Sequence, residues 1–232
     1  SIAEQAALCK QRVAVVLEGL RLGVITLDAL HLVFRAEHQT DALVLFDIGG
    51  GSSEVALIDR SKRRTPRLAE QIVAWTSLPV GVVSLAERFG GKHVTETVYA
   101  AMVDDVLGMI SRFDDRDALG SLVSGDRFHL LGTSGTVTTL AGIHLGLERY
   151  DRRRVDGLWM DDSDVAAMTD RLRSWSFEER VANACIGAER ADLVLAGCAI
   201  LDGIRTKKAL DDELTGKLKA AIADFKPLFQ AE

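Results

Sequence analysis

Three consecutive glycines interrupt residues 43–59, which read LVLFDIGGGSSEVALID and otherwise have the composition of two buried strands. The first stretch is short and continuously apolar, which is typical of a strand covered on both faces. The second stretch alternates, with Val55 and Leu57 on one face and Glu54 on the other. Glycine in such a region costs backbone entropy and contributes no packing. The triplet therefore indicates either a tight turn or a ligand close to the backbone.

The residues around the triplet have the chemistry of a phosphate site, because backbone N–H groups without side chains can converge on one anion. The predicted phosphate-binding residues of this loop are Gly49, Gly50, Gly51, Ser52 and Ser53. Asp47 can bind hydrated Mg²⁺ or orient a water molecule, and Glu54 can fix the loop or a metal-bound water. The alternative is a plain hairpin whose glycines supply positive φ angles. A hairpin needs one or two such glycines rather than three after an acid, which favours the ligand.

A second glycine turn follows another predicted strand in the stretch FHLLGTSGT. The predicted phosphate-binding residues of this turn are Gly132, Thr133, Ser134, Gly135 and Thr136. The N-terminus of the helix that follows would carry free N–H groups and a positive partial charge. In isolation, an ordinary N-cap turn explains this spacing equally well. The turn becomes informative because it is paired with the first glycine loop in one α/β unit.

Apolar periodicity divides the chain into a helical start, a three-strand meander and a mainly helical remainder. The expected helices cover residues 3–21, 27–38, 80–90, 94–113, 136–147, 161–175, 176–184, 189–208 and 210–225. The expected strands lie within residues 42–47, 53–59, 68–79 and 127–136. Expected N-caps are Thr26, Thr95, Ser163 and Ser176, the last in a capping box with Glu179. This order predicts an α/β fold with a mixed sheet and helices packed against it.

The composition excludes several classes of function. With 47% hydrophobic residues, the 232-residue chain can bury a sizeable core. The formal net charge of −6 disfavours a general polyanion-binding surface, so we expect no DNA partner and only local phosphate contacts. Two basic runs, residues 60–67 and 149–154, are interpreted as solvated loops, as charge runs usually are.

Cysteine usage and hydropathy indicate a soluble cytoplasmic protein. We expect reduced, buried thiols without zinc-binding spacing at Cys9, Cys185 and Cys198. No apolar run approaches the roughly 20 residues of a membrane-spanning helix, and no signal-peptide pattern opens the chain, so we expect no membrane partner. No GxSxG, GxxxxGKS/T or HExxH motif is present, and the glycine triplet does not fit GxGxxG.

Four ordered segments resemble the exopolyphosphatase and guanosine pentaphosphate phosphohydrolase (Ppx/GppA) family of the actin, sugar kinase and Hsp70 ATPase superfamily. These segments are VLFDIGGGSSEVALID, SLPVGVVSLAERF, FHLLGTSGTVTTLAGI and ERADLVLAGCAIL. The resemblance implies that residues 41–206 form the second of two ribonuclease H-like domains, with a mixed sheet whose first three strands are antiparallel. Residues 1–40 would then be a helical N-terminal segment, and residues 207–232 a helical C-terminal tail.

The resemblance also implies a phosphoanhydride hydrolase that uses Mg²⁺ to release phosphate from polyphosphate or guanosine pentaphosphate (pppGpp). Asp47 would be a catalytic acid and the metal ligand, Glu54 the second catalytic acid, and Arg190 and Asp192 structural residues. The family's DIGSNS-type loop and its SGEEEAR-type segment, which supplies a glutamate, do not occur in this sequence. The alternative is a non-catalytic phosphate- or nucleotide-binding module whose helical ends serve a partner or self-association, a homodimer included.

Overall fold

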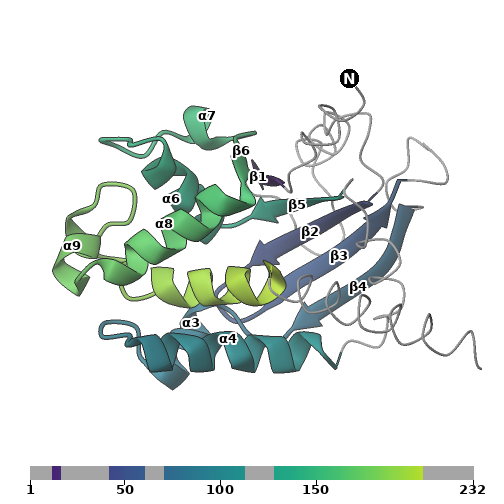
Figure 1. The fold of residues 1–232 in the computed structure, drawn as a ribbon, viewed down its shortest axis with the longest axis horizontal. Helices are drawn as coiled ribbons and strands as arrows, with labels where there is room; N and C mark the ends of the chain where they lie inside the picture. The colour runs from purple at the N-terminus through teal and green to yellow at the C-terminus, as the bar shows by residue number, and fades with distance from the viewer. Residues whose placement is uncertain (1–11, 17–41, 61–70, 113–127, 206–232) are drawn as a thin grey trace, which may run out of the picture.

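The structure is a computed structural model that describes residues 12–16, 42–60, 71–112 and 128–205. Within these ranges the strands form one six-stranded sheet in the order β4-β3-β2-β5-β1-β6, with helices against it (Figure 1). The strands are β1 (Arg12–Val16), β2 (Ala42–Ile48), β3 (Ser53–Asp59), β4 (Ile72–Leu78), β5 (Phe128–Thr133) and β6 (Trp159–Asp161). None of the described helices is long and apolar enough to cross a membrane.

The described helices all follow strand β4 in the sequence. They are α3 (Val82–Phe89), α4 (Glu96–Ile110), α6 (Gly135–His144), α7 (Arg152–Val155), α8 (Asp162–Ser174), α9 (Phe177–Ala182) and a helix over residues 194–205. This last helix, called the central helix below, is yellow-green in Figure 1 and lies between α8 and α4 in that view.

Strands β2, β3 and β4 form an antiparallel meander, and β5 pairs with the other edge of β2 in parallel. Asp47 of β2 is directly opposite Glu54 of β3, so the glycine loop connects the two strands just beyond this pair. Leu45 and Phe46 point to opposite faces of β2 and both are buried, as the continuously apolar sequence predicts. The predicted α/β fold, a ribonuclease H-like mixed sheet flanked by helices, is confirmed.

The prediction of a helix over residues 3–21 is wrong for residues 12–16, which form β1. This strand pairs in parallel with β5 and antiparallel with β6, so that Val13 is opposite both Leu130 and Met160. The stretch RVAVV is rich in β-branched residues, and strands on both sides satisfy its backbone N–H and C=O groups. The β propensity and the backbone hydrogen bonds together favour a strand more strongly than the helical periodicity favours a helix, because helix propensity is only a weak preference. The remaining predictions for residues 1–11, 17–41 and 207–232 lie outside the described residues.

Local capping sequences place most helix starts correctly. Thr95 caps α4 by accepting from a backbone N–H, and Ser176 and Glu179 form the predicted capping box at α9. The prediction for α8 is wrong by two residues, because Asp161 takes the cap position expected for Ser163. The reason is β6, a strand of three residues that is too short to be detected by alternation and that leads directly into α8.

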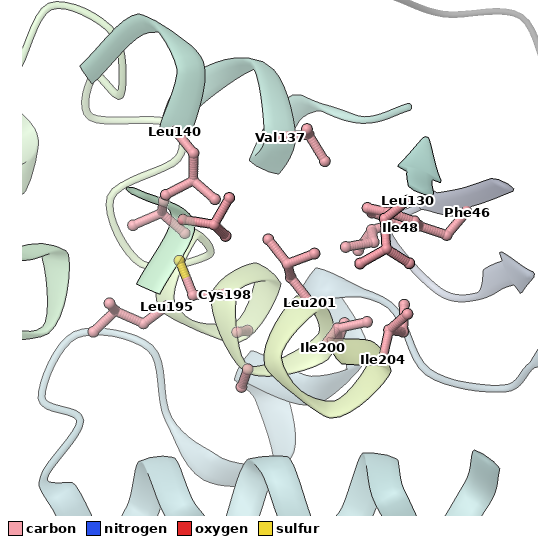
Figure 2. Packing of buried hydrophobic residues seen from close by; sticks show 14 of the residues in the cluster. Phe46, Ile48, Leu130, Val137, Leu140, Leu195, Cys198, Ile200, Leu201 and Ile204 are labelled. Carbon is pink, nitrogen blue, oxygen red and sulfur yellow. The ribbon is translucent and has the colours of Figure 1, made fainter. Parts of the chain in front are cut away.

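The central helix is the centre of the hydrophobic core. Figure 2 shows Leu201 and Ile204 beside Ile48 of β2, in one buried cluster with Leu130 of β5. Each of these side chains is at most 8% exposed. A fully buried aliphatic side chain of this size contributes about 1.5–3 kcal/mol relative to an exposed one. The helix therefore packs against the sheet near the strand ends that lead into the two predicted glycine loops.

Cys185 and Cys198 are free and buried, as predicted. Burial raises the pKa of the Cys198 thiol to about 12, and burial also raises the pKa of Cys185. Both side chains are therefore neutral thiols near pH 7 and act as small apolar residues. Cys9 lies outside the described residues.

A buried arginine anchors the segment that leads into the central helix. Arg180 of α9 is 2% exposed, and its guanidinium donates to the carbonyl oxygens of Gly91 at 3.1 Å and Ala191 at 2.8 Å. A Cβ atom at Gly91 would lie only 1.9 Å from the carbonyl oxygen of Asp192, so the two segments are in direct contact. The backbone next to Arg190 is thereby held in place.

Two helical glycines provide a matched test of this packing. A methyl group in Gly197→Ala would lie 2.1 Å from the Thr136 hydroxyl oxygen, so the central helix must shift away from α6. We expect the free energy of unfolding to fall by about 1–3 kcal/mol. Gly108→Ala in α4 meets no atom within 4 Å and is expected to raise it by about 0.5–1 kcal/mol. Urea denaturation measures both, and a Gly197→Ala protein as stable as wild type would contradict the close packing.

Candidate phosphate-binding site

The first glycine loop is docked on the N-terminus of α3 through its carbonyl groups. The backbone N–H groups of Val82 and Val83 donate to the carbonyl oxygens of Gly49 and Gly50, both at 2.9 Å. The N–H group of Gly49 donates to the carbonyl oxygen of Ser52 at 2.9 Å and closes the turn. The first N–H groups of a helix need acceptors from outside the helix, and here the loop supplies them.

This docking determines where the remaining N–H groups of the loop point. In a trans peptide the N–H and C=O groups are antiparallel, and the described chain contains no cis peptide. Since the carbonyl groups of Gly49 and Gly50 point at α3, the N–H groups of Gly50 and Gly51 point away from it. Neither N–H group has an acceptor among the described residues, and both glycines are exposed. Two adjacent backbone donors without acceptors are the arrangement that anion-binding nests use.

The loop closes a β2–β3 hairpin, but its glycines do not supply positive φ angles. Within the described chain, glycines with positive φ occur elsewhere, and Gly49, Gly50 and Gly51 are not among them. A Cβ atom at Gly49 would lie 2.9 Å from the Ser52 carbonyl oxygen, so close backbone contact explains that glycine. A Cβ atom at Gly51 would meet no atom within 4 Å. Neither a positive φ angle nor packing accounts for Gly51, which is exposed and has a free N–H group.

The residues after the triplet have different partners. Ser53 is fully buried in β3, and its hydroxyl donates to the carbonyl oxygen of Val80 at 2.7 Å. Its hydroxyl proton is therefore used in anchoring the loop. Ser52 and Ser77 both donate to one carboxylate oxygen of Glu54, at 2.8 and 2.9 Å. These two bonds hold the Glu54 carboxylate in one orientation beside the loop.

Asp47 and Glu54, the predicted catalytic acids, project from the same face of the sheet because they are directly opposite each other in the β2–β3 ladder. Two carboxylates fit Mg²⁺, which binds proteins through one or two carboxylates and takes its other oxygens from water and substrate phosphates. Among the described residues no group of three metal-ligating side chains occurs, so an all-protein metal cage does not fit. Asp47 itself has an interaction partner in the structure.

The second glycine turn lies beside the first because β5 runs parallel to β2, with Asp47 opposite Thr133. Ser134 caps α6 by accepting from the Val137 N–H at 3.3 Å. Gly132 is required by packing, since a Cβ atom there would lie 2.6 Å from the Phe46 ring. Thr133 is also buried. Of this predicted set, Gly135 and Thr136 reach the space between the two loops.

A cavity of ≈180 Å³ lies where the two loops meet. Gly49 and Gly50 line it from the first loop, and Gly135 and Thr136 line it from the second. Its cation is Arg190, whose guanidinium lies 3.4 Å from a Cβ atom placed on Gly135. Asp47 and Glu54 do not line this cavity, because Ile48, the next residue of β2, faces it instead.

Arg190 is the residue that the sequence interpretation assigned a structural role. Its side chain has no hydrogen bond or ion pair with any described residue, which distinguishes it from the buried anchor Arg180. Its place in the cavity favours contact with an anionic ligand. The sequence signal was the stretch ERAD after the two glycine turns, but the direction of the side chain depends on the tertiary fold.

The chain is thus an α/β domain of ribonuclease H-like fold in which two glycine turns and Arg190 surround a cavity. The model of the Ppx/GppA phosphatase family matches residues 28–211. The chain therefore belongs to the Ppx/GppA phosphatase family.

Solved structures with this fold include proteins of the same family. An exopolyphosphatase-like protein matches at a TM-score of 0.63 and 23% identity, covering 84% of this chain and 55% of its own. The Ppx/GppA enzyme of Aquifex aeolicus matches at a TM-score of 0.57 and 24% identity, and the match covers 75% of this chain and 52% of that protein. An exopolyphosphatase from Cytophaga hutchinsonii matches at a TM-score of 0.56 and 22% identity, and the match covers 75% of this chain and 54% of that protein. The chain thus spans about half the length of these proteins, and no functionally curated protein matches it significantly.

The docking of the loop on α3 can be tested at Gly81. A Cβ atom in Gly81→Ala would lie 2.4 Å from the carbonyl group of Gly50, so the loop must move away from α3. We expect binding of tripolyphosphate, measured by calorimetric titration, to fall by about tenfold or more as the nest opens. Gly90→Ala, at a positive φ outside the loop and with open space around it, is the control for general destabilisation. Equal losses of binding in the two variants would contradict a specific role of the docked loop.

Proposed function

We propose that this chain is the phosphate-binding part of a phosphoanhydride hydrolase that releases phosphate from polyphosphate or pppGpp. The observation that carries the proposal is the pair of free N–H groups at Gly50 and Gly51 beside a cavity with the unpaired cation Arg190. Membership of the Ppx/GppA family supports the reaction class. Buried free thiols at Cys185 and Cys198 agree with a reducing cytoplasm.

Each group has a distinct part in the proposed reaction. Gly50, which has a free N–H group, lines the cavity together with Arg190, and both would bind oxygens of a terminal phosphoryl group and oppose its negative charge. A water molecule attacks the phosphorus atom, the anhydride P–O bond breaks, and the remaining phosphate chain leaves with the bonding electron pair. Asp47 and Glu54 would hold Mg²⁺, which when bound neutralises phosphoryl oxygens. Glu54, oriented by two serines, can also position the water.

A binding module without hydrolysis is the second candidate, and one observation favours it. Asp47 and Glu54 extend from the face of β2 and β3 opposite to Ile48, which lines the cavity. Calorimetric titration with tripolyphosphate and ATP, combined with a phosphate-release assay, separates the two candidates. Binding without phosphate release supports the module, whereas Mg²⁺-dependent release supports the hydrolase.

Replacement of Asp47 tests the hydrolase. We expect Asp47→Ala to reduce Mg²⁺-dependent phosphate release from polyphosphate or pppGpp by about 100-fold or more, because the acid holds the metal or the water. Asp104→Ala removes an exposed acid of α4 and is the control for the change in net charge. Turnover by Asp47→Ala at the wild-type rate would refute the assignment of this acid.

Replacement of Arg190 tests the cavity independently of catalysis. Arg190→Gln removes the cation but no hydrogen bond within the described protein, so thermal unfolding should be unchanged. We expect the Kd for tripolyphosphate to rise about tenfold, as for the loss of a charge-assisted hydrogen bond. Arg112→Gln, which removes an exposed arginine outside the cavity, should leave the Kd within about twofold of wild type. Unaltered binding in Arg190→Gln would place the ligand elsewhere.

A further inference from the structure

Two serine hydroxyl groups donate hydrogen bonds to the Glu54 carboxylate. Ser52 Oγ lies 2.8 Å from Glu54 Oε1, and Ser77 Oγ lies 2.9 Å from the same oxygen. A hydroxyl group within about 2.6–3.2 Å of a carboxylate that takes up its proton is the arrangement of a nucleophile and its general base. Ser52 is the member of this group that lies in the glycine loop. Its hydroxyl therefore has the chemistry of a phosphoryl acceptor as well as that of a ligand for phosphate.

Two other hydroxyl groups of the glycine turns lack this chemistry. Ser53 is fully buried and donates to a backbone carbonyl oxygen at 2.7 Å. Thr133 is also buried and donates to another backbone carbonyl oxygen at 3.4 Å. A carbonyl oxygen accepts a hydrogen bond but does not take up the proton near pH 7, so neither hydroxyl has a base. Ser52 is half-buried, and because its proton is directed at Glu54, its oxygen lone pairs are available to a reacting group.

The residue before Ser52 has a donor that could hold the phosphoryl group. Gly51 is exposed, and its N–H group has no acceptor among the described residues. The cavity of ≈180 Å³ is lined by Gly49 and Gly50 of this loop but not by Gly51. The Gly51 N–H group is therefore available to a phosphate oxygen outside that cavity. Because consecutive Cα atoms are about 3.8 Å apart, a phosphoryl group bound to this N–H group lies within one residue of the Ser52 hydroxyl.

We propose that Ser52 is a site of self-phosphorylation, at which the chain accepts a phosphoryl group from a phosphoanhydride bound to the glycine loop. The Ser52 oxygen forms a bond to the terminal phosphorus atom, and its proton goes to the Glu54 carboxylate. The anhydride P–O bond breaks, and the shortened phosphate chain leaves with the bonding electron pair. The inference rests on the part of the proposed function that places a phosphoanhydride at this loop, and it adds a second acceptor besides water.

The test is incubation of the whole chain with tripolyphosphate and Mg²⁺, followed by denaturation and peptide mass spectrometry. We expect one phosphoryl group on Ser52, formed at a rate that saturates with tripolyphosphate concentration, as for a bound donor. Glu54→Gln removes the base and should slow this modification about 100-fold or more, and Ser52→Ala should abolish it. Ser111→Ala removes an exposed hydroxyl group at the end of α4 and should leave the rate within about twofold of wild type.

Ser77 is an internal control, because its hydroxyl donates to the same oxygen of Glu54 but belongs to β4 instead of the glycine loop. Equal phosphorylation of Ser77 and Ser52 would overturn the inference, since the loop would then have no part in the transfer. A rate that increases linearly with tripolyphosphate, or one that Glu54→Gln leaves unchanged, would overturn it as well. Release of free phosphate without any phosphoserine would remove this inference and leave the proposed function intact. A wild-type protein that does not bind tripolyphosphate would remove both.

Discussion

The hydrogen bonds from the N–H groups of Val82 and Val83 to the glycine loop are the interaction on which the site depends. They satisfy the start of α3, and they also rotate the peptide groups of the loop so that its remaining donors face outward. Gly81 allows this contact because any Cβ atom there would collide with Gly50. The outward direction of the loop N–H groups is thus a consequence of helix capping, and no dedicated side chain is needed to orient them.

Much of the fold follows from local sequence because the meander and most helices have strong periodicity and capping residues. Residues 12–16 could not be assigned in this way, since the partners that make them a strand are β5 and β6, which lie far away in sequence. The three-residue β6 and the four-residue α7 are shorter than the windows over which periodicity is detectable. Tertiary strand pairing and packing determine the structure of such short segments, whereas local propensity determines the structure of the long helices and strands.

For the candidate site, the sequence identifies glycines that packing does not explain. It does not predict the directions in which side chains point. Gly50 and Gly51 carry free donors, as the nest hypothesis requires, whereas Gly132 is explained by contact with the Phe46 ring. Composition cannot distinguish these two uses of glycine, because both need a missing side chain. Arg190 could be recognised in a sequence motif, but the direction of its side chain could not be predicted from the sequence. Its position beside Gly135 results from the anchoring of its segment by the fold.

The position of β1 in the sheet also bears on how the domain assembles. Val13 pairs with Leu130, more than a hundred positions later in the chain, and β1 stands between two strands that are both synthesised long after it. Closing a loop of that size costs entropy before any contact compensates, which is the property that slows the folding of domains with high contact order. Completion of the sheet at β1 therefore requires two strands from far along the chain, and without β1 one edge of β5, the strand that leads into the second glycine turn, would be left unpaired.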